Sequence, residues 1–305
     1  MSRKDKIDIA TGVIIINKHE GVTSHRIVQI MRRLFDTPRV GHTGTLDPMA
    51  TGVLPILVGR AVKASDFLVA EDKEYVAEMT LGITTDTDDI TGEILSKSEN
   101  IPDECAVREA INSFIGEITQ IPPMYSAIKV GGRKLVDLAR EGITVERKTR
   151  NVTINSIETE KISEKVYKMR VSCSKGTYIR TLCKDIGDKL GCGAVMSALK
   201  RTKSGSFTIE KSYTIDELEA LTMEERAALV MPTEELFAEC PAINVNDFYA
   251  KLIRGGTELY QNKLNTSYDI GQFVRIKHNN MFIALGQVAD FDGKTAVRPV
   301  KLFVL

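Results

Sequence analysis

The 305-residue chain has no excess charge of either sign and no long apolar run. Its 41 basic and 41 acidic residues give a formal net charge of +0, so no global field attracts nucleic acid and any RNA-binding surface must be local. No segment approaches the roughly 20 apolar residues that span a bilayer, and the first residues are polar and charged. We therefore expect a soluble, cytoplasmic protein that is not bound to a membrane.

Cysteine is sparse, and its spacing indicates neither a disulfide framework nor a structural metal site. The five cysteines are an odd set without a C-x-x-C pair or a histidine at zinc-finger spacing. A nucleotide-binding glycine motif is missing too, because GHTGTLDPMATG lacks the Lys-Ser/Thr ending of a phosphate-binding loop. These absences predict a protein of a reducing compartment that uses no metal and no cofactor.

Hydrophobic periodicity predicts a large domain of strands and helices. Residues 13–16 (VIII) are typical of a buried strand, and a helix is expected to start at a cap on Thr23 or Ser24. Residues 75–81 and 166–173 alternate between apolar and polar side chains, which predicts half-buried strands. Residues 81–92 are expected to form a turn. Further helices are expected at residues 107–115, 131–142 and 179–190, the last with Thr177 as its cap.

The end of the chain has a different pattern. Short helices are expected near residues 216–221 and 224–230, followed by Pro232 and Pro241. Beyond these prolines, glycines separate strand-like pieces, which predicts a small all-β module. The expected organisation is a polar N-terminal tail (1–11), a large domain (12–235) and a small domain (240–305).

The segment GHTGTLDPMATG, residues 41–52, holds a single carboxylate, that of Asp47. Its glycines permit backbone conformations closed to other residues, and Pro48 favours an extended conformation at Asp47. The loop is therefore able to hold a carboxylate in a fixed pose. The alternative is an Asx turn, in which Asp47 accepts hydrogen bonds from nearby backbone N–H groups. His42 is open to acid, base, ligand or stacking roles, although a lone loop histidine is more often a structural hydrogen-bonder.

Two other regions are candidates for binding. Residues 129–150 carry seven basic side chains against three acids, so a local RNA-binding surface is one interpretation and an ordinary solvated surface is the other. Lys175, Tyr178 and Arg180 gather where a predicted strand ends and a helix begins, which is a common place for a binding site.

Five longer motifs follow one another along the chain: GHTGTLDPMATGVLP, KEYVAEMTLGITTDTDDITG, QIPPMYSAIKVGGRK, CSKGTYIRTLCKDIG and LGCGAVMSALKRTKSGSF. In order and approximate spacing they resemble the bacterial tRNA pseudouridine synthase B family, which makes pseudouridine at position 55 in the tRNA T-loop. With the N-terminal NKHEGVTSHRIV, the resemblance covers roughly residues 12–232, and the tail is similar to the small RNA-binding PUA domain that often follows.

The resemblance implies an α+β pseudouridine synthase fold, with a mixed, largely antiparallel central sheet flanked by helices and a small C-terminal β-rich, PUA-like domain. It also implies isomerisation of a uridine in the tRNA T-arm without cofactor or metal. Nothing in the sequence demands a partner subunit, so a monomer without an obligate protein partner is expected. Asp47 matches the family's catalytic aspartate. Attack at C1′ and proton abstraction at C2′ both stay open for this carboxylate.

Six further residues match positions with family roles. Arg180 matches the arginine that pairs with the catalytic aspartate, and Asp89 an acid near the flipped nucleotides. The expected substrate-binding residues are His42, Tyr75, Tyr178 and Leu199. A uridine in a folded T-loop must be extruded at a cost of a few kcal/mol, and His42 is expected to help hold that arrangement.

Three positions depart from the family pattern: His19 stands where proline is common, Val62 where threonine is frequent and Val136 where tyrosine is usual. The first two are expected to alter packing only, whereas Val136 removes any role of that tyrosine. A rival hypothesis also stays open, in which the main task of the protein is to bind RNA and to open and reclose the tRNA elbow.

Overall fold

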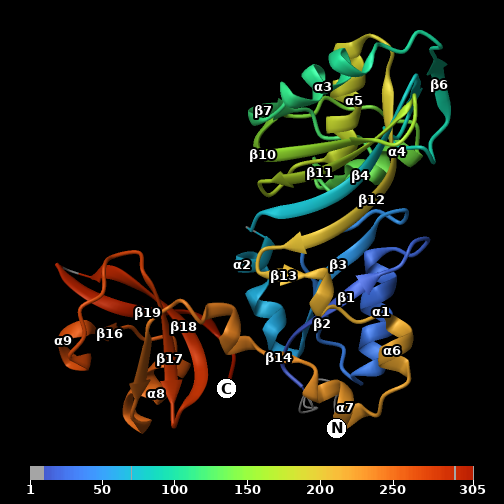
Figure 1. Ribbon diagram of the computed structural model, residues 1–305. Coiled ribbons are helices and arrows are strands. Elements are labelled where there is room, and N and C mark those ends of the chain that lie inside the picture. Colours follow the sequence, from blue (N-terminus) through green and yellow to red (C-terminus); the bar gives the residue numbers. More distant parts are fainter. Residues whose placement is uncertain (1–9, 70, 292, 305) are drawn as a thin grey trace.

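The computed structural model describes residues 10–69, 71–291 and 293–304. Within these ranges the chain forms a mixed α/β structure built on a ten-stranded sheet and a five-stranded sheet (Figure 1). Most of the predicted N-terminal tail, residues 1–9, lies outside the described residues. No helix in the described ranges is long and apolar enough to cross a membrane.

The ten-stranded sheet runs in the order β14-β1-β3-β12-β4-β11-β10-β7, while β13 pairs with β12 and β2 with β3. Every one of these pairs is antiparallel except β12 with β3. The predicted mixed, largely antiparallel sheet is therefore confirmed. Its strands are β1 (Gly12–Lys18), β2 (Val40–His42), β3 (Thr51–Val58), β4 (Lys73–Leu81), β7 (Gly116–Gln120), β10 (Arg150–Lys161), β11 (Val166–Cys173), β12 (Ala194–Ser204), β13 (Phe207–Thr208) and β14 (Met231–Pro232).

Strand β4 lies in the middle of this sheet, between β12 and β11. Its predicted alternation is confirmed, because Tyr75, Ala77, Met79 and Leu81 are buried and the residues between them are half-buried. This row of side chains shares one core with the apolar faces of α3 (Glu104–Asn112) and α5 (Ile179–Leu190). Figure 1 shows both helices beside β10 and β11, at the end of the sheet away from β1.

Helix α1 (Ser24–Leu34) packs near the other end of the sheet, beside β1 and β2 (Figure 1). The predicted cap at Thr23 is confirmed, since its side chain accepts a hydrogen bond from the Arg26 N–H at 3.1 Å. The shorter helices are α2 (Ser65–Val69), α4 (Leu135–Arg140), α6 (Ile215–Glu219) and α7 (Met223–Ala228), with 3-10 turns η1 (Gly59–Ala64), η2 (Ile209–Lys211) and η3 (Thr233–Phe237).

Two predicted helix ends are wrong. Thr177 does not cap α5, because its hydroxyl donates to the Ser174 carbonyl at 2.9 Å and closes the turn after β11. Tyr178 is the N-cap, without a side-chain hydrogen bond. Helix α3 stops before residues 114 and 115, since Gly116, with φ +108°, begins strand β7.

Two segments contain small hairpins that the sequence did not reveal. The predicted turn at residues 81–92 includes strand β5 (Ile83–Thr85), which pairs with β6 (Ile94–Lys97). The predicted helix at 131–142 begins only at Leu135. Before it, Gly131 and Gly132 adopt φ +58° and +85° and join β8 (Lys129–Val130) to β9 (Arg133–Lys134). Two consecutive positive φ angles favour a tight hairpin over a helix start.

The five-stranded sheet has the order β15-β17-β18-β19-β16 and its own apolar core. The predicted β-rich C-terminal part is confirmed, but it is not all-β, because two helices lie beside this sheet. The longer one, α8 (Asp247–Arg254), is capped by Asn246. The remaining elements are α9 (Gln261–Leu264), β15 (Ala242–Val245), β16 (Leu259–Tyr260), β17 (Phe273–His278), β18 (Met281–Phe291) and β19 (Lys294–Leu302).

An aromatic cluster joins the five-stranded sheet to the rest of the chain. Phe67 of α2 packs edge-on against Phe237 of η3 and Phe273 of β17, at centroid distances of 5.3 and 5.4 Å. Phe282 and Phe303 stack in the same cluster at 5.1 Å. The five-stranded sheet therefore packs against α2 and η3 through an apolar contact.

Candidate active site

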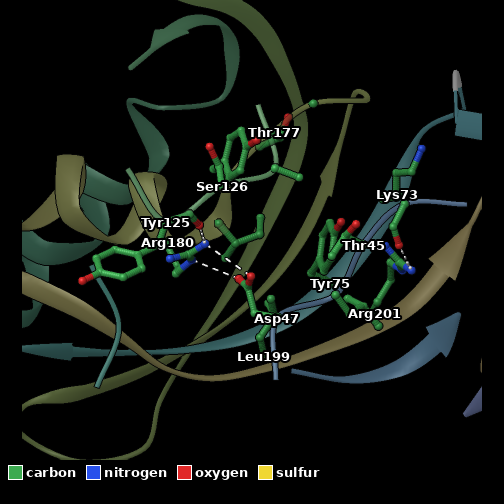
Figure 2. A pocket seen from close by; sticks show the side chains of 16 residues that line it. Thr45, Asp47, Lys73, Tyr75, Tyr125, Ser126, Thr177, Arg180, Leu199 and Arg201 are labelled. Atoms are coloured by element: carbon green, nitrogen blue, oxygen red, sulfur yellow. Dashed lines mark hydrogen bonds and ion pairs between the residues drawn. The ribbon is translucent and has the colours of Figure 1, made fainter. Parts of the chain in front are cut away.

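A cavity of about 260 Å³ lies among the loop after β2, strands β4 and β12 and the start of α5 (Figure 2). It brings together five predicted site residues that come from four separate parts of the chain: Asp47, Tyr75, Tyr178, Arg180 and Leu199. The other two predicted residues, His42 and Asp89, do not line this cavity.

Asp47 is held in place through its neighbours in the loop. The Ser24 hydroxyl accepts from the Leu46 N–H and donates to the Leu46 carbonyl, both at 2.9 Å. The Pro48 carbonyl accepts from the Gly21 N–H at 2.9 Å. Among the described residues, no backbone N–H donates to the Asp47 carboxylate, so the Asx turn considered above is not formed. The carboxylate is 35% exposed and faces the cavity.

Arg180 binds the Asp47 carboxylate with two nitrogens. Nε lies 3.0 Å from Oδ2, and Nη2 lies 3.3 Å from Oδ1. The same guanidinium donates to the Tyr125 carbonyl at 2.7 Å and to the Thr87 carbonyl at 3.0 Å, and its side chain is 5% exposed. A planar guanidinium in this two-point geometry fixes the direction of a carboxylate as well as its charge.

Asp89 contacts Arg180 through a nitrogen other than those that bind Asp47, and it does not line the cavity. Its Oδ2 is 3.7 Å from Nη1 of Arg180. Its Oδ1 accepts from the Thr91 N–H at 3.0 Å and from the Thr87 and Thr91 hydroxyls at 2.9 and 2.6 Å. This geometry favours an effect of Asp89 through Arg180 rather than direct contact with a group in the cavity.

Burial and charge oppose each other at Asp47. Burial raises the pKa of its carboxyl, and the nearby Asp89 adds to this, while the charges of Arg180 and Lys18 lower it. Lys18 is fully buried at the end of β1 and donates to the His19 and Pro48 carbonyls at 2.9 and 3.0 Å. Burial lowers the pKa of this ammonium to about 8, against the attraction of Asp47. Two cations thus favour the ionised form of one partly buried carboxylate.

Tyr75 and Leu199 supply the apolar wall of the cavity from neighbouring strands, β4 and β12. Burial raises the pKa of the Tyr75 phenol. Tyr178 sits at the N-cap of α5, where an amide clamp fixes its backbone. The buried Gln120 side chain accepts from the Tyr178 N–H at 3.0 Å and donates to the Tyr178 carbonyl at 3.1 Å.

His42 lies on β2, half-buried, and burial together with the Arg201 charge lowers the pKa of its imidazole. A neutral imidazole is thereby favoured near neutral pH. The sequence reasoning missed Lys18, Gln120 and Arg201, all of which are buried around the site. No local sequence pattern signalled their burial, because Lys18 and Gln120 are the last residues of β1 and β7 and Arg201 lies inside β12.

Known proteins are similar to this chain in sequence and in fold. The family model described as "TruB family pseudouridylate synthase (N terminal domain)" matches residues 32–179, and that of the "tRNA pseudouridylate synthase B C-terminal domain" matches residues 180–238. A protein of Alkaliphilus oremlandii named tRNA pseudouridine synthase B is 48% identical over 92% of this chain and 94% of its own. Its namesake in Clostridium tetani is 42% identical over 96% and 99%.

Solved structures resemble the fold over almost its whole length. The crystal structure of a Cbf5-Nop10-Gar1 complex matches with a TM-score of 0.71 and 28% identity, over 99% of this chain and 88% of that one. An H/ACA RNP bound to a substrate RNA containing 2′-deoxyuridine matches with a TM-score of 0.69 and 26% identity, over 97% and 86%. With its two family matches and these relatives, the chain belongs to the tRNA pseudouridine synthase B family, a family of isomerases.

Proposed function

We propose that this chain isomerises uridine 55 in the tRNA T-loop to pseudouridine, with Asp47 as the reacting carboxylate. The observation that carries the proposal is the two-point Asp47–Arg180 pair inside a cavity that also holds Tyr75, Tyr178 and Leu199. The names of its relatives support tRNA as the substrate. The proposed enzyme works in the cytoplasm as a monomer, without a cofactor or an obligate protein partner.

The reaction breaks the C1′–N1 bond, turns the uracil in place and forms a C1′–C5 bond. A proton leaves C5 and another is gained at N1, so no group is lost from the nucleotide. A carboxylate assists either by attack at C1′, where positive charge develops, or by taking a proton from C2′. Both routes need an ionised Asp47, which the Arg180 and Lys18 charges favour against burial.

The cavity suits a base that has left its stack. Tyr75 offers a ring face and Leu199 an apolar surface, and both are about nine-tenths buried. We assign His42, outside the cavity on β2, to the space that the flipped bases leave, and Asp89 to the support of Arg180. Residues 12–235 form the proposed catalytic domain, and residues 240–305 the proposed PUA-like RNA-binding domain.

The test uses an unmodified tRNA transcript that carries tritium at uracil C5, because pseudouridine formation releases that label. Wild-type protein should release one equivalent, and a transcript with cytidine at position 55 should leave the label at other uridines untouched. Asp47→Asn should bind the transcript and lose turnover by roughly 10⁴-fold. Asp216→Asn, an exposed aspartate on α6, is the matched control and should retain full activity.

The same assay separates the rival hypothesis of an RNA-folding protein. Wild-type protein that binds the transcript but releases no label contradicts the enzymatic proposal. Release that persists in Asp47→Asn contradicts the assignment of the carboxylate. Release from a transcript that lacks uridine 55 contradicts the proposed target position.

A further inference from the structure

Arg201 is a second buried arginine of the cavity, and its contacts differ from those of Arg180. It is 1% exposed, and its side chain donates from Nε to the Val53 carbonyl at 2.7 Å and from Nη2 to the Gly44 carbonyl at 2.9 Å. Among the described residues it forms no ion pair with a carboxylate, whereas Arg180 reaches two. A buried cation without an anionic partner is costly, so its position calls for an explanation beyond stability.

The glycines of the Asp47 loop make room for this arginine. At Gly44, with φ +72°, a Cβ atom would lie 3.2 Å from Nη1 of Arg201. At Gly52, with φ +98°, a Cβ atom would lie 2.2 Å from the backbone oxygen of Arg201. Both ends of the loop around Asp47 are thus shaped to the backbone and side chain of one residue on β12.

Arg201 also faces Tyr75. The two residues are cross-strand partners in the β4–β12 pair. Burial raises the pKa of the Tyr75 phenol, and the nearby charge of the Arg201 guanidinium opposes this shift. Figure 2 shows Arg201 beyond Tyr75, on the side away from Asp47 and Arg180.

We propose that Arg201 is a positioning residue, which holds the Tyr75 phenol and the Asp47 loop in one fixed relation. Through Gly44 and Val53 it fixes the loop, and through its contact with Tyr75 it fixes the ring that faces the base. In the proposed reaction, the group that acts on the sugar and the group that packs on the uracil must both fit one nucleotide. The contribution of Arg201 to turnover rests on the proposed function, whereas its contact with Tyr75 does not.

The test replaces Arg201 in two ways. Arg201→Lys keeps the charge but loses the planar fork that donates to two carbonyls, and Arg201→Gln removes the charge as well. Lys200→Gln, an exposed neighbour on the same strand, is the matched control. Both Arg201 variants should lower the single-turnover rate on saturating transcript by about 100-fold, because small misplacements of reacting groups have effects of this size. The affinity for the transcript should change less than about threefold.

A spectroscopic measurement tests the contact with Tyr75 without any substrate. The chain has no tryptophan, so ultraviolet absorbance reports tyrosine ionisation cleanly, and the difference from a matching Tyr75→Phe protein isolates Tyr75. This transition should move to higher pH in Arg201→Gln and stay near its wild-type position in Arg201→Lys.

The outcomes separate this inference from the proposed function. An Arg201→Lys protein with the wild-type single-turnover rate overturns the positioning role. If Arg201→Gln does not fold, Arg201→Lys alone still tests that role. An unchanged Tyr75 transition in a folded Arg201→Gln protein overturns the contact. If wild-type protein releases no label from position 55, the proposed function fails, while the titration still decides whether Arg201 acts on Tyr75.

Discussion

The two sides of the cavity each contain a buried arginine, but the two arginines have different surroundings. Arg180 is 3.0 Å from Asp47 and 3.7 Å from Asp89, so its charge is matched by carboxylates. Arg201 instead donates to the Val53 and Gly44 carbonyls and faces a phenol. The first arrangement affects the ionisation of Asp47, the proposed reacting group, and the second fixes where backbone and ring lie.

This difference teaches that burial of a cation does not by itself indicate its role. A guanidinium paired with a carboxylate changes the pKa of that carboxylate, and its loss is expected to change a pH profile. A guanidinium bonded to carbonyls fixes geometry, and its loss is expected to lower the rate at every pH.

Arg180→Met should give the largest combined effect, because it lowers both turnover and stability. It leaves Asp47 and the buried Asp89 without their cation, so we expect a loss of about 3 kcal/mol in unfolding free energy and of roughly 10³-fold in turnover. Arg180 lowers the pKa of Asp47 against burial, so without it that pKa rises further. The acid limb of the single-turnover rate should therefore move to higher pH.

Arg170→Met is the matched control, because Arg170 and its partner Glu74 are exposed by 49% and 30%. Such a surface pair contributes less than about 1 kcal/mol, so stability and the acid limb should hardly change. An acid limb that stays in place in Arg180→Met would show that Arg180 does not control the ionisation of Asp47.

Much of the fold was accessible from the sequence, because local periodicity reports which face of an element is buried. The alternation at Tyr75 and the cap at Thr23 were predicted in this way and are confirmed. Helix α8 was missed, although Asn246 before an amphipathic stretch was a usable cap signal. The glycines that separate the strand-like pieces favoured an all-β module instead.

The site was predictable only in part, because its contacts join residues far apart in the chain. Arg180 lies 133 positions after Asp47, and Arg201 lies 148 after Val53. Asp47 and Arg180 were matched through the family resemblance, and the roles assigned to them stay predictions. Lys18 and Arg201 were missed because lysine and arginine side chains are almost always exposed, and no local sequence pattern signals that these two are buried.

Replacing the glycines of the Asp47 loop tests the Arg201 side of the comparison, and the expected effect is a loss of unfolding free energy. Gly52→Ala should cost about 4 kcal/mol in unfolding free energy, because the new Cβ meets the Arg201 backbone in addition to the strain of a positive φ. Gly44→Ala should cost less, since the tip of the Arg201 side chain is able to shift. Urea denaturation gives both values.

Gly191→Ala is the control for this pair, because Gly191 has φ +73° at the end of α5 and nothing lies within 4 Å of its added Cβ. It should show the strain of the left-handed conformation alone, about 1 to 2 kcal/mol. Equal losses in all three variants would mean that the loop does not depend on close approach to Arg201.

Lys18 tests the Asp47 side through the pH dependence of stability, with an expected effect smaller than that of Gly52→Ala. Burial lowers the pKa of its ammonium from 10.5 to about 8, so between these values the unfolded chain binds more protons than the folded one. Wild-type stability should therefore rise relative to Lys18→Met as the pH increases from about 8 to 10.5, by up to about 3 kcal/mol. Denaturant titrations at pH 7 and 10 of wild type, Lys18→Met and the exposed-site control Lys200→Met measure the difference.

A difference in unfolding free energy between wild type and Lys18→Met that does not change with pH would contradict a buried, charged Lys18 beside Asp47. A gap that changes equally for Lys200→Met would assign the effect to general surface charge instead.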